Sequence, residues 1–128
     1  MTIEEQIKYW FDPATEDLLV ADSLFEKKHY SWCLFIGHLV IEKALKGHFV
    51  KMFQETPPKI HDLIKLSNKI SLPLNDEMLD FLADLNDFQI DARYPEQKKA
   101  VYQLATYEFT LNYLTKIKEL FEWLKSRI

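Results

Sequence analysis

The stretch SWCLFIGHLVIEKALKGHFVKMFQ, residues 31–54, decides the fold of this chain. It contains no proline, and on an α-helix its apolar side chains fall on two opposite sides. A helix that is apolar on two sides must be covered on both, which predicts a helix in the middle of a bundle. Glu42 and Lys46 have the spacing of a surface ion pair. We interpret the polar residues of its second half as a solvated ridge: Glu42, Lys43, Lys46, His48 and Lys51.

Length and composition favour one small globular domain spanning residues 1–128. Hydrophobic residues make up 48% of the chain and charged residues 28%, an ordinary balance for a folded domain. The net charge of −4 argues against a strongly basic protein that coats nucleic acid. With only two glycines, the chain has no glycine-rich phosphate loop, and a β-rich fold with many tight turns is disfavoured.

The N-terminus and the cysteine content point to the cytoplasm. The first ten residues, MTIEEQIKYW, lack the apolar run of a signal peptide, and we expect no membrane span. Cys33 is the only cysteine, so the chain has no internal disulfide, and we expect its thiol to be a small buried side chain.

The N-terminal third predicts two helices before the central one. Thr2 followed by Glu5 fits a capping box, which starts a first helix of a turn or two. Asp12 and Pro13 then fit the N-cap and first position of a second helix, which runs to about residue 28. After a short corner, Ser31 is the predicted N-cap of the central helix.

The rest of the chain predicts three more helices. Two prolines at 57 and 58 end the central helix, and a shorter helix follows over 59–70. Asn75 caps a fourth helix over 76–90, and a final helix runs unbroken over 95–126 with two apolar stripes. One hypothesis is that part of this apolar surface is a self-association interface, and the alternative is that one stripe covers the first short helix. The predicted fold is all-α, an up-and-down bundle of four to five helices.

The fourth predicted helix has a strongly acidic outer face. Residues 76–91 contain six acids and no base. We interpret this face as solvated, because no histidine or second carboxylate cluster on another element obviously completes a metal site. We therefore predict no metal and no cofactor. The face is lined by Asp80, Asp84, Asp87 and Asp91.

Several short sequence pieces, in a fixed order, resemble a known family. The first is A-x(2)-DL-x(2)-A from Ala14, and the second is EKALK at 42–46. His61-Asp62-Leu63 and Ala92-Arg93-Tyr94-Pro95 follow. Together they resemble a prokaryotic HEPN domain of the kind whose gene lies beside that of a minimal nucleotidyltransferase. The resemblance implies a homodimer, a role with nucleotides or RNA, and a partner in a toxin–antitoxin-like pair.

Ribonucleases of this family carry an arginine followed, after four to six residues, by a histidine. The only arginines here are Arg93 and Arg127, and every histidine precedes Arg93. Residues 98–100, where the histidine would lie, are Lys-Lys-Ala, and lysine is a poor base at its ordinary pKa. We therefore expect a nucleotide- or partner-binding module rather than an enzyme. The alternative is a divergent, metal-independent ribonuclease toxin.

The candidate binding residues lie in three places. The first group lies at the start of the last predicted helix and consists of Arg93, Tyr94, Lys98 and Lys99. Arg93 could hold a phosphate, which the helix N-terminus also favours, and Tyr94 could stack on a base. Equally, Arg93 could pair with Asp91 or Asp87. Lys43 requires an acidic partner such as Glu16 or Asp17 if it is buried, or else it contacts a phosphate. His61 either bonds a carbonyl at its turn or transfers protons, which requires a carboxylate on its ring. The full candidate set is Arg93, Tyr94, Lys98, Lys99, Lys43 and His61.

Overall fold

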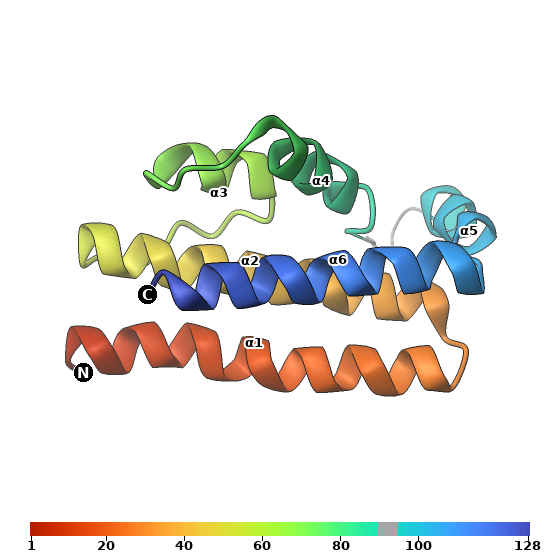
Figure 1. The fold of residues 1–128 in the computed structure, drawn as a ribbon, viewed down its shortest axis with the longest axis horizontal. Coiled ribbons are helices and arrows are strands. Elements are labelled where there is room, and N and C mark those ends of the chain that lie inside the picture. The colour runs from red at the N-terminus through yellow and green to blue at the C-terminus, as the bar shows by residue number, and fades with distance from the viewer. Residues whose placement is uncertain (90–94) are drawn as a thin grey trace.

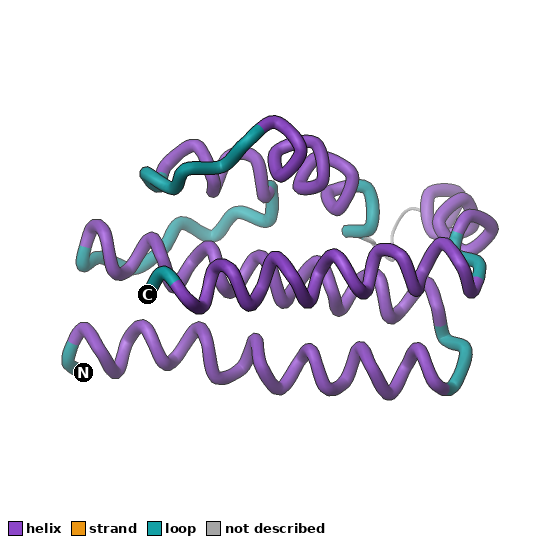
Figure 2. Tube along the Cα trace, viewed as in Figure 1, coloured by secondary structure: helices purple, strands orange, loops and turns teal. Residues whose placement is uncertain are grey.

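A computed structural model describes residues 1–89 and 95–128, and every regular element in them is an α-helix. Figure 1 shows the long helices side by side, with short helices packed above them and another at one end; Figure 2 shows the loops between them. The all-α class predicted from the sequence is confirmed. In chain order the helices are α1 (Ile3–Glu26), α2 (Tyr30–Phe53), α3 (Leu63–Lys69), α4 (Asp76–Asn86), α5 (Pro95–Leu104) and α6 (Tyr107–Ser126).

Helix α2 is the centre of the bundle, as its two apolar sides predict. It contacts each of the other five helices of the described chain. Helix α6 runs in the same direction as α2. Ile117 of α6 lies against Gly37 of α2, and Leu124, later in α6, lies against His48, later in α2. The segments from α3 to α5 carry the chain back between them (Figure 1).

The second half of α2 differs from its predicted solvated ridge. Glu42, Lys46 and His48 are buried, Lys43 is half-buried, and only Lys51 is exposed. The ridge interpretation was wrong because α2 has neighbours on nearly every side, so its polar residues have to find protein partners instead of water.

Helix α1 is a single helix, and the predicted restart at Asp12 is wrong. The predicted cap at its start is confirmed, since Thr2 Oγ1 accepts a hydrogen bond from the amide of Glu5 at 3.1 Å. Pro13 lies inside the helix and removes one amide donor. Its side chain and that of Tyr9, whose carbonyl loses that donor, are both exposed, so water can replace the missing bond.

The turn into α2 also differs from the prediction. The helix begins at Tyr30, with His29 in the N-cap position and without a side-chain hydrogen bond to the helix. Ser31 is buried inside the first turn, so it is not the N-cap. The tight packing of α1 against α2, instead of a capping hydroxyl, fixes where this helix starts.

Helices α3 and α4 are shorter than predicted, and the cap predicted for α4 is confirmed. Asp62 accepts hydrogen bonds from the amides of Ile64 and Lys65, so α3 begins at Leu63 and not at residue 59. Asn75 caps α4 through the amide of Met78 at 2.8 Å. Helix α4 ends at Asn86, earlier than the predicted end at residue 90.

The predicted final helix is two helices. Helix α5 ends at Leu104, and Thr106 then caps α6 by accepting a hydrogen bond from the amide of Phe109 at 3.3 Å. A threonine inside an apolar pattern competes with helix continuation through such a bond. Figure 1 shows α5 turned across the start of α6.

The main core lies between α2 and its neighbours. Its largest fully buried side chains include Phe121, Leu34, Ile41 and Leu45. Cys33 is buried as predicted, and burial raises the pKa of its thiol to about 12, with Asp22 adding to the shift. None of the described helices has both the length and the apolar character of a membrane span.

Candidate functional site: a buried polar cluster on the central helix

The candidate site is a cluster of polar side chains built around Glu42. One carboxylate oxygen, Oε2, accepts a hydrogen bond from Lys46 Nζ at 3.2 Å, one helical turn further on. The other oxygen, Oε1, lies 3.0 Å from His61 Nδ1. The side chains of Glu42 and Lys46 are only 6% and 7% exposed, so this is an ion pair inside the protein. Lys46 Nζ also lies 5.6 Å from the centre of the Trp10 ring.

His61 reaches this cluster from the loop before α3. A carboxylate oxygen accepts hydrogen bonds, so Nδ1 of His61 is the donor in this contact. The side chain is 58% exposed. The structure therefore gives His61 the oriented carboxylate that a proton-transferring histidine requires, in place of the backbone carbonyl that was the other expectation.

His38 is the buried member of the cluster, one helical turn before Glu42. Its Nδ1 lies 3.9 Å from Glu42 Oε1, too far for a hydrogen bond, and neither ring nitrogen forms one within the described residues. Burial lowers the pKa of His38, although Glu42, the carbonyl of His61 and the side chain of Asn86 favour its charged form. His38 is therefore neutral at neutral pH.

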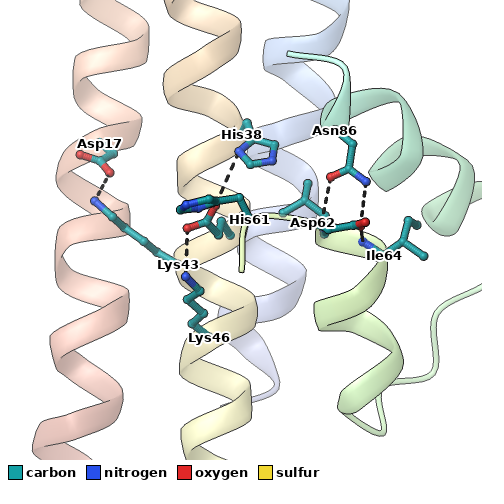
Figure 3. A network of polar contacts seen from close by, with 10 residues as sticks. Asp17, His38, Lys43, Lys46, His61, Asp62, Ile64 and Asn86 are labelled. Carbon is teal, nitrogen blue, oxygen red and sulfur yellow. Dashed lines mark hydrogen bonds and ion pairs between the residues drawn. The ribbon is translucent and has the colours of Figure 1, made fainter. Parts of the chain in front are cut away.

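A second set of bonds fixes the loop that carries His61. Asn86, at the end of α4, donates to Asp62 Oδ1 at 3.0 Å and accepts from the amide of Leu63 at 2.9 Å. Burial alone would raise the pKa of Asp62, but the hydrogen bonds from Lys65, Asn86 and Ile64 hold it below its usual value. Figure 3 shows Asp62 and Asn86 beside each other, with His61 reaching from the same loop toward α2.

Lys43 lies outside this cluster and pairs with α1. Its Nζ lies 2.5 Å from Asp17 Oδ2, and both side chains are about a quarter exposed. Asp17 was one of the expected partners, so the core salt bridge is the interpretation that the contacts favour over a phosphate contact. Figure 3 shows Lys43 extending from α2 toward Asp17, away from His61.

The remaining candidates do not join the Glu42 cluster in the described structure. Arg93 and Tyr94 lie outside the described residues, as does Asp91 of the acidic face. Lys98 belongs to α5, but its side chain is outside the described part, while Lys99 is exposed on the same helix. Within the described residues, no three histidine, cysteine or acidic side chains converge into a metal site.

Sequence reasoning missed that His38, Glu42 and Lys46 form one site. A signal was present, because the three residues are spaced four apart and therefore share one face of a helix predicted to be covered. Polar side chains on a covered helix must pair with one another or with residues from another element. The contribution of Asn86, from a helix far away in sequence, had no such signal.

Fold and cluster together define a small helical-bundle domain whose central helix holds a buried, partly charged network. The family model of the HEPN domain matches residues 7–127, almost the entire chain. The chain therefore belongs to the HEPN domain family, as its sequence pieces indicate.

Two solved structures share this fold. The crystal structure of TT1696 from Thermus thermophilus superposes with a TM-score of 0.80 at 18% identity, covering 96% of this chain and 98% of that one. The crystal structure of ST0689, described as an archaeal HEPN homologue, gives a TM-score of 0.73 at 21% identity, covering 94% and 96%. No curated protein matches the sequence.

Proposed function

We propose that this HEPN-domain protein is a binding module that works as a homodimer with a protein partner. The proposed partner is a minimal nucleotidyltransferase in a toxin–antitoxin-like pair, and the proposed ligand is a nucleotide or RNA. Family membership over residues 7–127 is the observation that carries this proposal. The order of the EKALK, HDL and ARYP pieces is what points to the nucleotidyltransferase-associated type.

An exposed apolar surface supports the proposed homodimer. Leu104 at the end of α5 and Tyr107 and Leu111 at the start of α6 are all exposed, as is Tyr102. Leu104, Tyr107 and Leu111 begin one of the two apolar stripes predicted for the last segment, and the later members of that stripe, Leu114, Phe121 and Leu124, are buried in the bundle. Exposed large apolar side chains in one short segment of the chain favour an interface there. A second copy of the chain is the occupant that the homodimer proposal assigns to them.

The sequence after Arg93 favours binding over catalysis. Lys98, Lys99 and Ala100 stand where the family's ribonucleases have their histidine. Lysine supplies positive charge for a phosphate, but it exchanges protons poorly near neutral pH unless its pKa is strongly lowered. A charged, non-catalytic contact with a nucleotide is the role that fits these residue types.

One observation favours the second candidate function, a divergent ribonuclease toxin. The Nδ1 atom of His61 is held by the Glu42 carboxylate at 3.0 Å, and the side chain is 58% exposed. This arrangement of carboxylate and imidazole is the one that general bases use. In such a reaction His61 would accept the proton of an RNA 2′-hydroxyl, while Glu42 would orient the ring and stabilise its charged form.

Co-expression with the product of the neighbouring gene tests the first function. The two proteins should co-purify, and a nucleotide should raise the melting temperature of the complex or of the protein alone. Sedimentation should give a dimer at tens of micromolar. If the proteins never co-purify and no nucleotide shifts melting, the binding function is wrong, and a monomer in sedimentation removes the homodimer.

Growth after induced expression tests the second function. A ribonuclease predicts growth arrest that His61→Asn and Arg93→Ala each relieve, because they remove the base and the cation. Lys43→Met is the matched control, since Lys43 pairs with Asp17 away from His61. Arrest that survives both substitutions, or no arrest at all, counts against the enzyme.

A further inference from the structure

A groove of about 860 Å³ runs between α4 and the second half of α6, away from the Glu42 cluster. The two helices touch at one end of it, where Phe81 stacks on Tyr113 with ring centres 5.6 Å apart. Tyr113 also donates a hydrogen bond to Asp84 at 3.3 Å. From this contact the groove continues between the N-terminal part of α4 and the C-terminal part of α6.

The groove has apolar and aromatic side chains that remain partly accessible. Met78 and Phe81 contribute from α4, and Trp123 from α6, each of them half-buried. Buried Leu120 lies between them in the lining. Aromatic residues and methionine are enriched in the centres of protein interfaces, where an apolar side chain can cover them.

Carboxylates dominate the charged lining. Four acidic side chains, those of Glu77, Asp80, Asp84 and Glu119, stand against two basic ones, those of Lys116 and Arg127. Within the part of the chain that the structure describes, none of the four carboxylates is in an ion pair. The lining of the groove therefore carries two more acidic than basic side chains, which gives it an excess of negative charge.

The two cations of the groove lie over its aromatic rings. The guanidinium carbon of Arg127 is 4.4 Å from the centre of the Trp123 ring. Lys116 Nζ is 6.0 Å from the centre of Phe81 and 5.8 Å from that of Tyr113. These contacts show that the rings accept cationic groups on their faces.

We propose that this groove docks a basic amphipathic segment of a partner protein. Its apolar side chains would cover Met78, Phe81 and Trp123, and its lysines or arginines would pair with the carboxylates of the groove. The charge of the groove repels phosphate, so RNA and nucleotides are not its ligands. The inference deepens the proposed partner-binding function and rests on it, because it assigns the surface on which the partner sits.

A synthetic amphipathic helix of leucine, alanine, lysine and arginine is the probe, labelled for fluorescence anisotropy and titrated with the full chain. Glu119→Lys places a positive charge in the groove, whereas Glu122→Lys makes the same change at an exposed position on the same helix outside it. The dissociation constant should rise about threefold to tenfold with Glu119→Lys and change by less than about twofold with Glu122→Lys.

Equal weakening by both substitutions would show that only net charge attracts the peptide, and the docking site would be refuted. Equal binding of a matched peptide with glutamate in place of the basic residues, or no binding at all, would also refute it. Co-purification with the neighbouring gene product separates the two proposals. If the Glu119→Lys variant still co-purifies fully with the partner, the groove proposal is wrong but the proposed function stands. If the groove binds the peptide but no partner co-purifies with the protein, the proposed function is wrong.

Discussion

Replacing Glu42 by glutamine should destabilise the protein far more than breaking an exposed ion pair. The substitution keeps the size of the side chain but removes the charge that compensates Lys46, whose side chain is only 7% exposed. Breaking a buried pair from one side costs about 3–5 kcal/mol. Since the amide oxygen of glutamine can still accept one hydrogen bond, we expect a loss of about 3 kcal/mol in the free energy of unfolding.

The pair between Asp22 and Lys118 provides the comparison. Its atoms lie 2.6 Å apart, closer than in the buried pair, but the side chains are 37% and 44% exposed. Exposed pairs contribute at most about 1 kcal/mol, so Asp22→Asn should cost about 1 kcal/mol or less. Urea unfolding followed by circular dichroism, at one fixed protein concentration, measures both losses.

A second substitution decides whether charge burial is the cause. Adding Lys46→Met to Glu42→Gln removes the uncompensated ammonium and leaves an apolar chain of similar length. The double variant should recover at least about 1 kcal/mol relative to Glu42→Gln alone. If it recovers nothing, or if Glu42→Gln and Asp22→Asn lose equal stability, the argument from burial is wrong.

Three further predictions concern the same framework. Gly47→Ala should lower the free energy of unfolding by about 1–2 kcal/mol in urea unfolding, because its new methyl would overlap the ring of Phe11, and overpacking outweighs the helix propensity gained. A stabilised variant would contradict this. Burial lowers the pKa of both His38 and His48, so the unfolded chain binds more protons below about pH 6.5, and stability should fall as the pH drops from about 7 to 5. A flat profile in urea unfolding at several pH values would refute it. Asp62→Ala removes the α3 cap and the hydrogen bond from Asn86, so it should lower the free energy of unfolding by about 1–2 kcal/mol in thermal unfolding. An unchanged free energy would contradict the stabilising role of this cap.

The sequence was sufficient to predict the helix ends that depend on strong local signals. It was not sufficient for those that depend on packing against other helices. Thr2, Asp62 and Asn75 are caps whose side chains reach amides two or three residues away, so local sequence is sufficient to find them. Pro13 is a strong local breaker, yet helix α1 continues through it. The long packed interface with α2 stabilises both halves of α1 and overrides the lost amide donor.

The candidate site was only partly predictable. Asp17 as the partner of Lys43 was anticipated, because a half-buried lysine requires an acid and Asp17 lies on a helix expected to pack nearby. A proton-transferring His61 requires a carboxylate on its ring, but sequence cannot show that Glu42, 19 positions away, supplies it. Whether Arg93 forms an anion site stays a prediction, since it lies outside the described residues.

The sequence by itself determined an all-helical domain with residues 31–54 at its centre, because helical periodicity and the scarcity of glycine are local properties of the chain. It also placed that chain in its family through short pieces in a set order. Only the tertiary structure decided that Glu42 and Lys46 are inside the protein, because burial depends on which elements cover a helix. The groove between α4 and α6 arises for the same reason: it is the space left by two helices that are distant in sequence, and no local pattern encodes it.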